Sequence, residues 1–276
     1  MTSTDSLTPH QLLDTAIEAA RRAGAVLAER FAGERTIEYK GGIDLVTDAD
    51  RAAEKVMLEL LAERYPGHGI LAEESGVSRG EGYRWILDPL DGTTNYSHRL
   101  PHFCVSVAVE GDEGLLAGVI HDPIRGETFA ASRGGGATLN GEPICPADTT
   151  ELDGALLCTG FPYDVRERPE APLGLFNRLI KRAQGVRRFG SAALDLAYVA
   201  CGRFDGFFEF GLKPWDIAAG ALIVQEAGGR IARIDGEPLD LAIGDILGAA
   251  PGVYERIRSE TAEFIQDIRW QPIKRW

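Results

Sequence analysis

Residues 84–95 read RWILDPLDGTTN, an apolar run that leads into two aspartates, a glycine and a pair of threonines. Residues 84–87 predict a buried strand, and Asp88 stands where that strand ends. Pro89 fixes φ and has no N–H, and Asp91-Gly92 turns the chain. Residues 92–94 can then expose backbone N–H groups at the start of a helix, a position that favours a bound phosphate.

Taken alone, this stretch is more typical of two successive turns, Asp-Pro and then Asp-Gly, than of a functional site. Two further acids change that interpretation. Glu73 follows the apolar residues 70–72, and Asp216 lies in the first turn of a helix that Pro214 opens. If these acids converge with Asp88 and Asp91, their mutual repulsion has to be offset, and a bound cation would offset it.

The possible ligands are all oxygen atoms, with no histidine or cysteine close to them in the sequence. Such a set favours Mg²⁺, Mn²⁺ or Ca²⁺ over Zn²⁺. Two such ions about 4 Å apart can activate water and stabilise a leaving oxygen. The residues therefore predict metal-assisted hydrolysis of a phosphate ester.

The composition excludes several other classes of protein. The chain has 276 residues, of which 29 are Lys or Arg and 42 are Asp or Glu, and a formal charge of −13 makes direct binding of nucleic acid unlikely. There is no apolar run long enough to span a membrane, and residues 1–11 contain no apolar signal core. No C-x-x-C pair is formed by Cys104, Cys145, Cys158 and Cys201, so free thiols and a cytoplasmic location are expected.

The order of the expected elements predicts an α/β fold. Thr8, Pro9 and Gln11 form a capping box that starts a long core helix, and a second helix follows Thr47 with Asp50 in its first turn. Residues 36–46 are expected to be extended and interrupted at 41–42. Strands are expected at 70–72, 84–87, 103–109, 115–120, 127–131, 155–158, 185–189 and 206–210. Further helices are expected at 173–183, from a Ser191 cap to about 201, and from 214 to 228.

Over residues 10–265 the chain resembles the inositol monophosphatase family. The resemblance rests on residues 44–50 (DLVTDAD), 72–75 (AEES), 85–95, 187–198 (RRFGSAALDLAY) and 212–220 (LKPWDIAAG). It implies the layered αβαβα fold of inositol monophosphatases and sugar phosphatases. One unit would span 1–276, with an N-terminal lobe at about 8–145, a smaller lobe at about 153–265 and the active site between them.

The same resemblance implies the metal ligands. Glu73, Asp88 and the Leu90 carbonyl would hold one Mg²⁺, and Asp88, Asp91 and Asp216 a second. A third, weaker ion would bind Glu73 through water, and Mn²⁺ is a possible substitute. Thr93, oriented by Asp50 and with Glu73 close by, would help to take a proton from the attacking water.

Substrate contacts follow from the resemblance as well. The N–H groups of Gly92 and Thr93 would bind phosphate oxygens. The hydroxyls of the alcohol would meet Asp91, Ser191, Ala192, Glu209 and Asp216. Lys213 either tunes the pocket or is a solvated lysine. Arg187 and Arg188 face the substrate or a neighbouring subunit, or form a salt bridge at the rim.

The implied activity is hydrolysis of myo-inositol 1-phosphate to inositol and phosphate, by in-line attack of a metal-activated water. Tyr96 after residues 91–95 favours the inositol branch over the branches that act on histidinol phosphate or nucleotide 3′-phosphates. Fructose 1,6-bisphosphate and other polyol phosphates remain alternatives, as does a regulatory interaction protein that retains the fold. A homodimer and sensitivity to Li⁺ are also implied.

Overall fold

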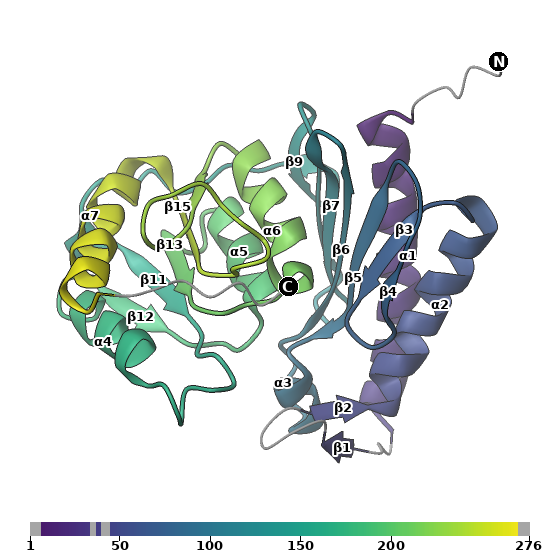
Figure 1. Ribbon diagram of the computed structural model, residues 1–276, viewed down its shortest axis with the longest axis horizontal. Helices are drawn as coiled ribbons and strands as arrows, with labels where there is room; N and C mark the ends of the chain where they lie inside the picture. The colour runs from purple at the N-terminus through teal and green to yellow at the C-terminus, as the bar shows by residue number, and fades with distance from the viewer. Residues whose placement is uncertain (1–6, 34–36, 40–44, 270–276) are drawn as a thin grey trace.

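The computed structural model describes residues 7–33, 37–39 and 45–269, which form five layers (Figure 1). Read from right to left in Figure 1, two long helices cover an eight-stranded sheet, two helices lie between that sheet and a five-stranded sheet, and two more cover the far side. The layered α/β fold is thereby confirmed. The helices are α1 (Pro9–Phe31), α2 (Asp48–Arg64), α3 (Thr93–Ser97), α4 (Glu170–Leu179), α5 (Ala192–Ala200), α6 (Pro214–Glu226) and α7 (Pro251–Asp267).

The eight-stranded sheet has the order β10-β9-β8-β7-β6-β5-β3-β4 and the five-stranded sheet β12-β11-β13-β15-β14. Strands β1 (Ile37–Tyr39) and β2 (Leu45–Thr47) pair separately. The larger sheet holds β3 (Gly69–Ala72), β4 (Gly76–Ser78), β5 (Arg84–Asp91), β6 (Cys104–Gly111), β7 (Gly114–Asp122), β8 (Glu127–Ser132), β9 (Gly136–Leu139) and β10 (Glu142–Pro143). The smaller sheet holds β11 (Leu156–Thr159), β12 (Gly185–Arg187), β13 (Gly206–Glu209), β14 (Arg230–Ala232) and β15 (Ile246–Ala249).

Strand β5 runs on past its expected end at residue 87 to Asp91, but with a break in register. It pairs in parallel with β3 and antiparallel with β6, and its pairing with β6 shifts between Asp88 and Asp91. Pro89 has no N–H to donate to a ladder, and an irregularity of this kind changes the direction of neighbouring side chains. The proline therefore sets how the two aspartates leave the sheet.

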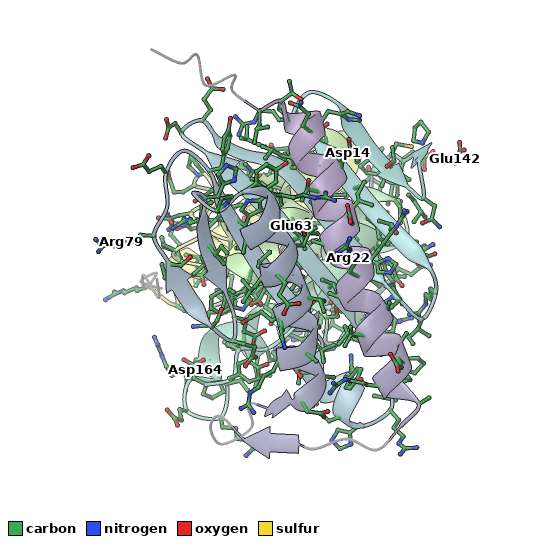
Figure 2. The ribbon with its side chains drawn as sticks, turned by 90° about the vertical axis from the view of Figure 1, so that its right-hand side faces the viewer. Asp14, Arg22, Glu63, Arg79, Glu142 and Asp164 are labelled. Atoms are coloured by element: carbon green, nitrogen blue, oxygen red, sulfur yellow. The ribbon has the colours of Figure 1, made fainter. Side chains whose placement is uncertain are left out.

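The expected cap at Thr8 is present, and the helix expected after Thr47 is also capped. The Thr8 hydroxyl accepts from the Gln11 N–H at 3.3 Å, and Gln11 Oε1 accepts from the Thr8 N–H at 2.9 Å. At α2, Asp50 Oδ2 accepts from the Thr47 N–H at 2.8 Å. Figure 2 shows α1 and α2 side by side, with Asp14, Arg22 and Glu63 on their outer, exposed side. The interruption expected at residues 41–42 lies outside the described residues.

Several elements differ from the expectation. The helix expected at 173–183 is α4, Glu170–Leu179, and the strand expected at 185–189 ends at Arg187. Ser191 occupies the N-cap of α5, but its side chain makes no cap hydrogen bond. Helix α7 and strands β4, β9, β10, β14 and β15 were not predicted. No helix in the described ranges is long and apolar enough to cross a membrane.

The layer between the sheets is one continuous core. Ile86, Ile120 and Phe129 from the larger sheet and Phe207 from the smaller one belong to the same buried cluster as α5 and α6. The division into lobes near residues 145–153 stays a prediction. Helix α6 approaches the larger sheet most closely at Gly118 on β7, where an added Cβ would lie 2.9 Å from the Ala219 carbonyl oxygen.

Gly118→Ala is expected to destabilise the protein by about 1–3 kcal/mol, because the added methyl group meets helix backbone that cannot move aside as a flexible side chain would. The free energy of unfolding from urea titration measures this. Gly67→Ala is the matched control, since nothing lies within 4 Å of a Cβ at that position. Equal stability of the two variants would contradict the proposed close packing of α6.

Candidate active site

A cavity of about 370 Å³ opens where elements of both sheets end. The ends of β3, β5 and β13 meet the first turns of α3, α5 and α6 there, so segments far apart in the sequence share one site. Ligands commonly bind at the ends of strands in layered α/β proteins. The cavity lining includes all the expected site residues except Asp50, namely Glu73, Asp88, Leu90, Asp91, Gly92, Thr93, Ser191, Ala192, Glu209 and Asp216.

Asp88 is the most buried of the acids in the lining, with 2% of its surface exposed. Its pKa lies well above the ordinary aspartate value, first because of burial and then because of repulsion from Glu73, Asp91 and Asp216. Oδ1 accepts from the Leu90 N–H at 2.9 Å, which orients the carboxyl. Glu73, Asp91 and Asp216 are therefore close enough to Asp88 to disfavour its charge.

Asp91 connects the larger sheet to α5. Its Oδ2 accepts from the Ser191 hydroxyl at 2.6 Å and from the Ala193 N–H at 2.8 Å. The carboxylate thus satisfies the start of α5 in place of the Ser191 side chain. Burial raises the pKa of Asp91 to about 6, while these hydrogen bonds act in the opposite direction.

Thr93 and Asp50 form a buried pair next to the cavity. The Thr93 hydroxyl lies 3.0 Å from the Leu90 carbonyl oxygen and 3.3 Å from Asp50 Oδ1. Asp50 is fully buried behind Thr93, and burial raises its pKa to about 6 although Thr47 donates to it. Asp50 is absent from the cavity lining and contacts the lining residue Thr93.

Gly92 makes the turn into α3 possible. Its φ is 97°, in the left-handed region, and a Cβ there would lie 3.1 Å from the His102 carbonyl oxygen. Glycine adopts this conformation without the steric cost that other residues incur. The first N–H groups of α3 have no partner within the helix and lie beside Asp91 and Asp88, where they can receive an anion.

The side of the cavity near the smaller sheet holds Glu209 and Arg188. The pKa of Glu209 lies well above the ordinary glutamate value because of burial and of repulsion from Asp195 and Asp216, and Arg188 opposes this rise. Arg188 and Lys213 both line the cavity, which supports their interpretation as pocket residues. Arg187 does not, and its guanidinium lies 3.4 Å from the Val186 carbonyl oxygen.

Two parts of the site were missed by the sequence analysis. The loop 160–163 follows β11 and lines the cavity, so the same strand-end rule could have found it. Asn95 is buried and its amide nitrogen donates to the carbonyls of His102 at 2.9 Å and Phe189 at 2.7 Å. No local sequence pattern predicts the contact with Phe189, because the two residues are 94 positions apart.

The donor set suits a hard cation. Carboxylates and a backbone carbonyl are the ligands that Mg²⁺ prefers, and a divalent ion would neutralise the repulsion that raises the Asp88 pKa. Within the described ranges, no three acidic, histidine or cysteine side chains already surround a common point closely enough to hold an ion without other donors. Mg²⁺ commonly takes part of its coordination from water and substrate phosphate.

The family model described as the inositol monophosphatase family matches residues 8–269. The chain is 42% identical over 262 residues to the Nus factor SuhB of Escherichia coli strain K12, covering 94% of this chain and 98% of that protein. It is 45% identical over 246 residues to the Nus factor SuhB of Pseudomonas aeruginosa strain PAO1, with coverages of 86% and 90%.

Solved structures show the same similarity. The inositol monophosphatase from Anabaena (Nostoc) sp. PCC 7120 superposes with a TM-score of 0.84 at 42% identity, covering 97% of this chain and 99% of that one. The extragenic suppressor protein suhB from Bartonella henselae gives a TM-score of 0.86 at 37% identity, with coverages of 91% and 98%. The chain belongs to the inositol monophosphatase family.

Asn95→Asp is expected to lower the free energy of unfolding by about 1–3 kcal/mol, because a carboxylate would face carbonyl oxygens that accept hydrogen bonds from the Asn95 amide. The loop that carries Ser191 should loosen too, and kcat/KM for phosphate release should fall. Asn177→Asp on α4 introduces the same charge at an exposed amide and is the control. Unchanged stability of the Asn95 variant would show that the link is dispensable.

Proposed function

We propose that the protein is a Mg²⁺-dependent phosphomonoesterase that hydrolyses myo-inositol 1-phosphate to myo-inositol and phosphate. The observation that carries this proposal is the Asp88 carboxyl beside the N-terminus of α3, whose pKa is raised by burial and then by three neighbouring acids. Membership of the inositol monophosphatase family supports phosphatase chemistry. The reaction is direct in-line attack of water on phosphorus, without a covalent phosphoenzyme.

The larger sheet supplies most of the metal ligands. Glu73, Asp88 and the Leu90 carbonyl would hold one ion, Asp88, Asp91 and Asp216 would hold a second, and a third would bind weakly near Glu73. Mn²⁺ could replace Mg²⁺ at these sites. When bound, divalent ions make water more acidic and offset the negative charge that develops on the leaving oxygen.

Thr93 and Asp50 provide the route for the proton of the attacking water. When the Thr93 hydroxyl donates to Asp50, its oxygen keeps lone pairs that can accept a proton from the attacking water. Asp50 is buried and does not line the cavity, which suits a group that receives a proton and does not bind substrate. Glu73 lines the same cavity and would assist.

Phosphate and alcohol occupy different parts of the cavity. The N–H groups of Gly92 and Thr93 would bind phosphate oxygens at the start of α3. The alcohol hydroxyls would form hydrogen bonds with Asp91, Ser191, Ala192, Glu209 and Asp216. Because the pKa of Glu209 is raised, its carboxyl can act as donor or acceptor.

The alcohol is the finer part of the proposal. The alternatives are fructose 1,6-bisphosphate, other polyol phosphates, histidinol phosphate and nucleotide 3′-phosphates. Measured phosphate release across this panel decides between them. A hundredfold preference for a bisphosphate would overturn the inositol assignment and leave the phosphatase intact.

We further infer a cytoplasmic homodimer whose turnover is inhibited by Li⁺.

The sequence relatives named Nus factor SuhB favour a second candidate role, in which the chain also binds a macromolecular partner and catalysis is secondary. The −13 charge argues against direct contact with nucleic acid. A pull-down that recovers no stable partner, beside normal Mg²⁺-dependent turnover, would remove this second role.

Asp88→Asn is expected to reduce kcat by at least about a hundredfold, since it removes the carboxylate shared by both proposed ions. The fold should survive, because the amide relieves the repulsion from Glu73, Asp91 and Asp216. Phosphate release with and without Mg²⁺, together with circular dichroism, measures both effects. Asp153→Asn changes an exposed acid and should have normal activity. Near-normal turnover of the Asp88 variant would exclude the metal assignment.

Below about pH 6, the rate at saturating Mg²⁺ is expected to fall, because Asp50 has a pKa of about 6 and accepts the Thr93 proton only as a carboxylate. Asp50→Asn should be slow at every pH and should lack this acid limb. The raised pKa of Asp50 also stabilises the folded state at pH values below the ordinary aspartate pKa, and this contribution to stability is lost as the pH rises through about 6. A full acid limb in Asp50→Asn would assign the limb to another group.

A further inference from the structure

Helix α2 carries a second buried carboxylate, one turn after Asp50. Glu54 is only 3% exposed and lies on the same buried side of the helix. Glu63, in contrast, is on the outer side of α2 in Figure 2. Glutamate is rarely this buried unless hydrogen bonds or charges compensate it. The partners of Glu54 therefore identify what the helix holds in place.

Those partners lie in the turn that follows β3. Glu54 Oε2 accepts from the Glu74 N–H at 2.9 Å. Burial raises the pKa of this carboxyl, while the Glu74 N–H and then the hydroxyl and N–H of Ser75 act in the opposite direction. On the other side of the turn, the Glu73 N–H donates to the Leu87 carbonyl of β5 at 3.2 Å. The backbone around Glu73 is thereby held from two directions.

We propose that Glu54 is a positioning residue that holds the 73–75 turn so that the Glu73 carboxyl stays beside Asp88, ready to bind a metal ion. Glu54 does not line the cavity, so it acts only through the turn. The proposal rests on the proposed metal-dependent function. Helix α2 thereby positions two segments of the cavity wall. Asp50 contacts Thr93, and Glu54 contacts the turn that carries Glu73.

The carboxylate is suited to this role because its partners are all donors. Oε2 accepts from the Glu74 N–H and the Ser75 donors also favour the ionised carboxyl, whereas a glutamine would turn an NH₂ group toward donors and lose part of these interactions. Glu54→Gln keeps the size of the side chain and the helix propensity of the residue. The variant therefore weakens the hold on the turn with little other change.

The test compares wild type, Glu54→Gln and the control Glu63→Gln, all as full chains. Mn²⁺ affinity is measured by calorimetry in the absence of substrate, and phosphate release is measured against metal concentration. For Glu54→Gln we expect Mn²⁺ binding to weaken about tenfold, the usual scale for a partner that orients a ligand. The rate should recover to near the wild-type value at saturating metal, with an unchanged acid limb. Glu63→Gln should match wild type throughout.

A Glu54→Gln variant with wild-type Mn²⁺ affinity, or with a rate that saturating metal does not restore, would overturn the proposal. Should this variant not fold, Ser75→Ala removes a single donor to Glu54 at an exposed position, and a smaller weakening in the same direction is required. A wild-type chain without metal-dependent turnover would overturn the proposed function, and this inference with it. Metal-dependent wild type beside an unaffected variant would overturn only the role of Glu54.

Discussion

The hydrogen bonds that Asp91 accepts from Ser191 and Ala193 hold the site together, because they join the end of a strand in the larger sheet to the start of α5. Without them the first N–H groups of α5 would lose their partners, and the buried Asp91 carboxylate would lose its two short hydrogen bonds. One carboxylate thus serves as a helix cap and as a cavity group. Asn95 adds a second link between the same regions, from α3 to Phe189.

The buried acids fall into two groups that the protein compensates differently. Asp50 and Glu54 on α2 are satisfied by the chain itself, through hydroxyl and N–H donors. The charge of Asp88, in contrast, is disfavoured by burial and by the neighbouring acids Glu73, Asp91 and Asp216. Fixed donors lower the cost of the first group permanently, whereas the repulsion at Asp88 is of a kind that a bound cation would offset.

Much of the fold followed from local signals. The cap at Thr8, the helix that follows Thr47, the strand that begins at Arg84 and the helix opened by Pro214 depend on neighbouring residues, so local sequence was enough to predict them. Strand β15 and helix α7 were missed because their stability comes from packing: Leu247 and Ile257 share a buried cluster contributed by segments far apart in the chain. Local pattern carries little information about such elements.

The same distinction applies to the site. Its acids could be proposed because each follows an apolar run, and the structure does bring them to one cavity. Glu54 and Asn95 escaped notice because each is a polar side chain whose function depends on a partner that only the fold supplies: Glu74 across a helix–turn contact, and Phe189 from the other sheet's region.

The cavity also separates two tasks that a phosphatase must combine. The larger sheet and α2 supply Glu73, Asp88 and Asp50, which are fixed by backbone hydrogen bonds and by a proline-broken strand. The smaller sheet and its loops supply Glu209, Arg188 and residues 160–163. Substitutions in the second set would alter which alcohol fits while the chemistry at phosphorus is kept, because these residues are not among the proposed metal ligands. Selectivity among phosphate esters should therefore depend mainly on the smaller-sheet half, whereas hydrolysis depends on the acids of the larger sheet together with Asp216.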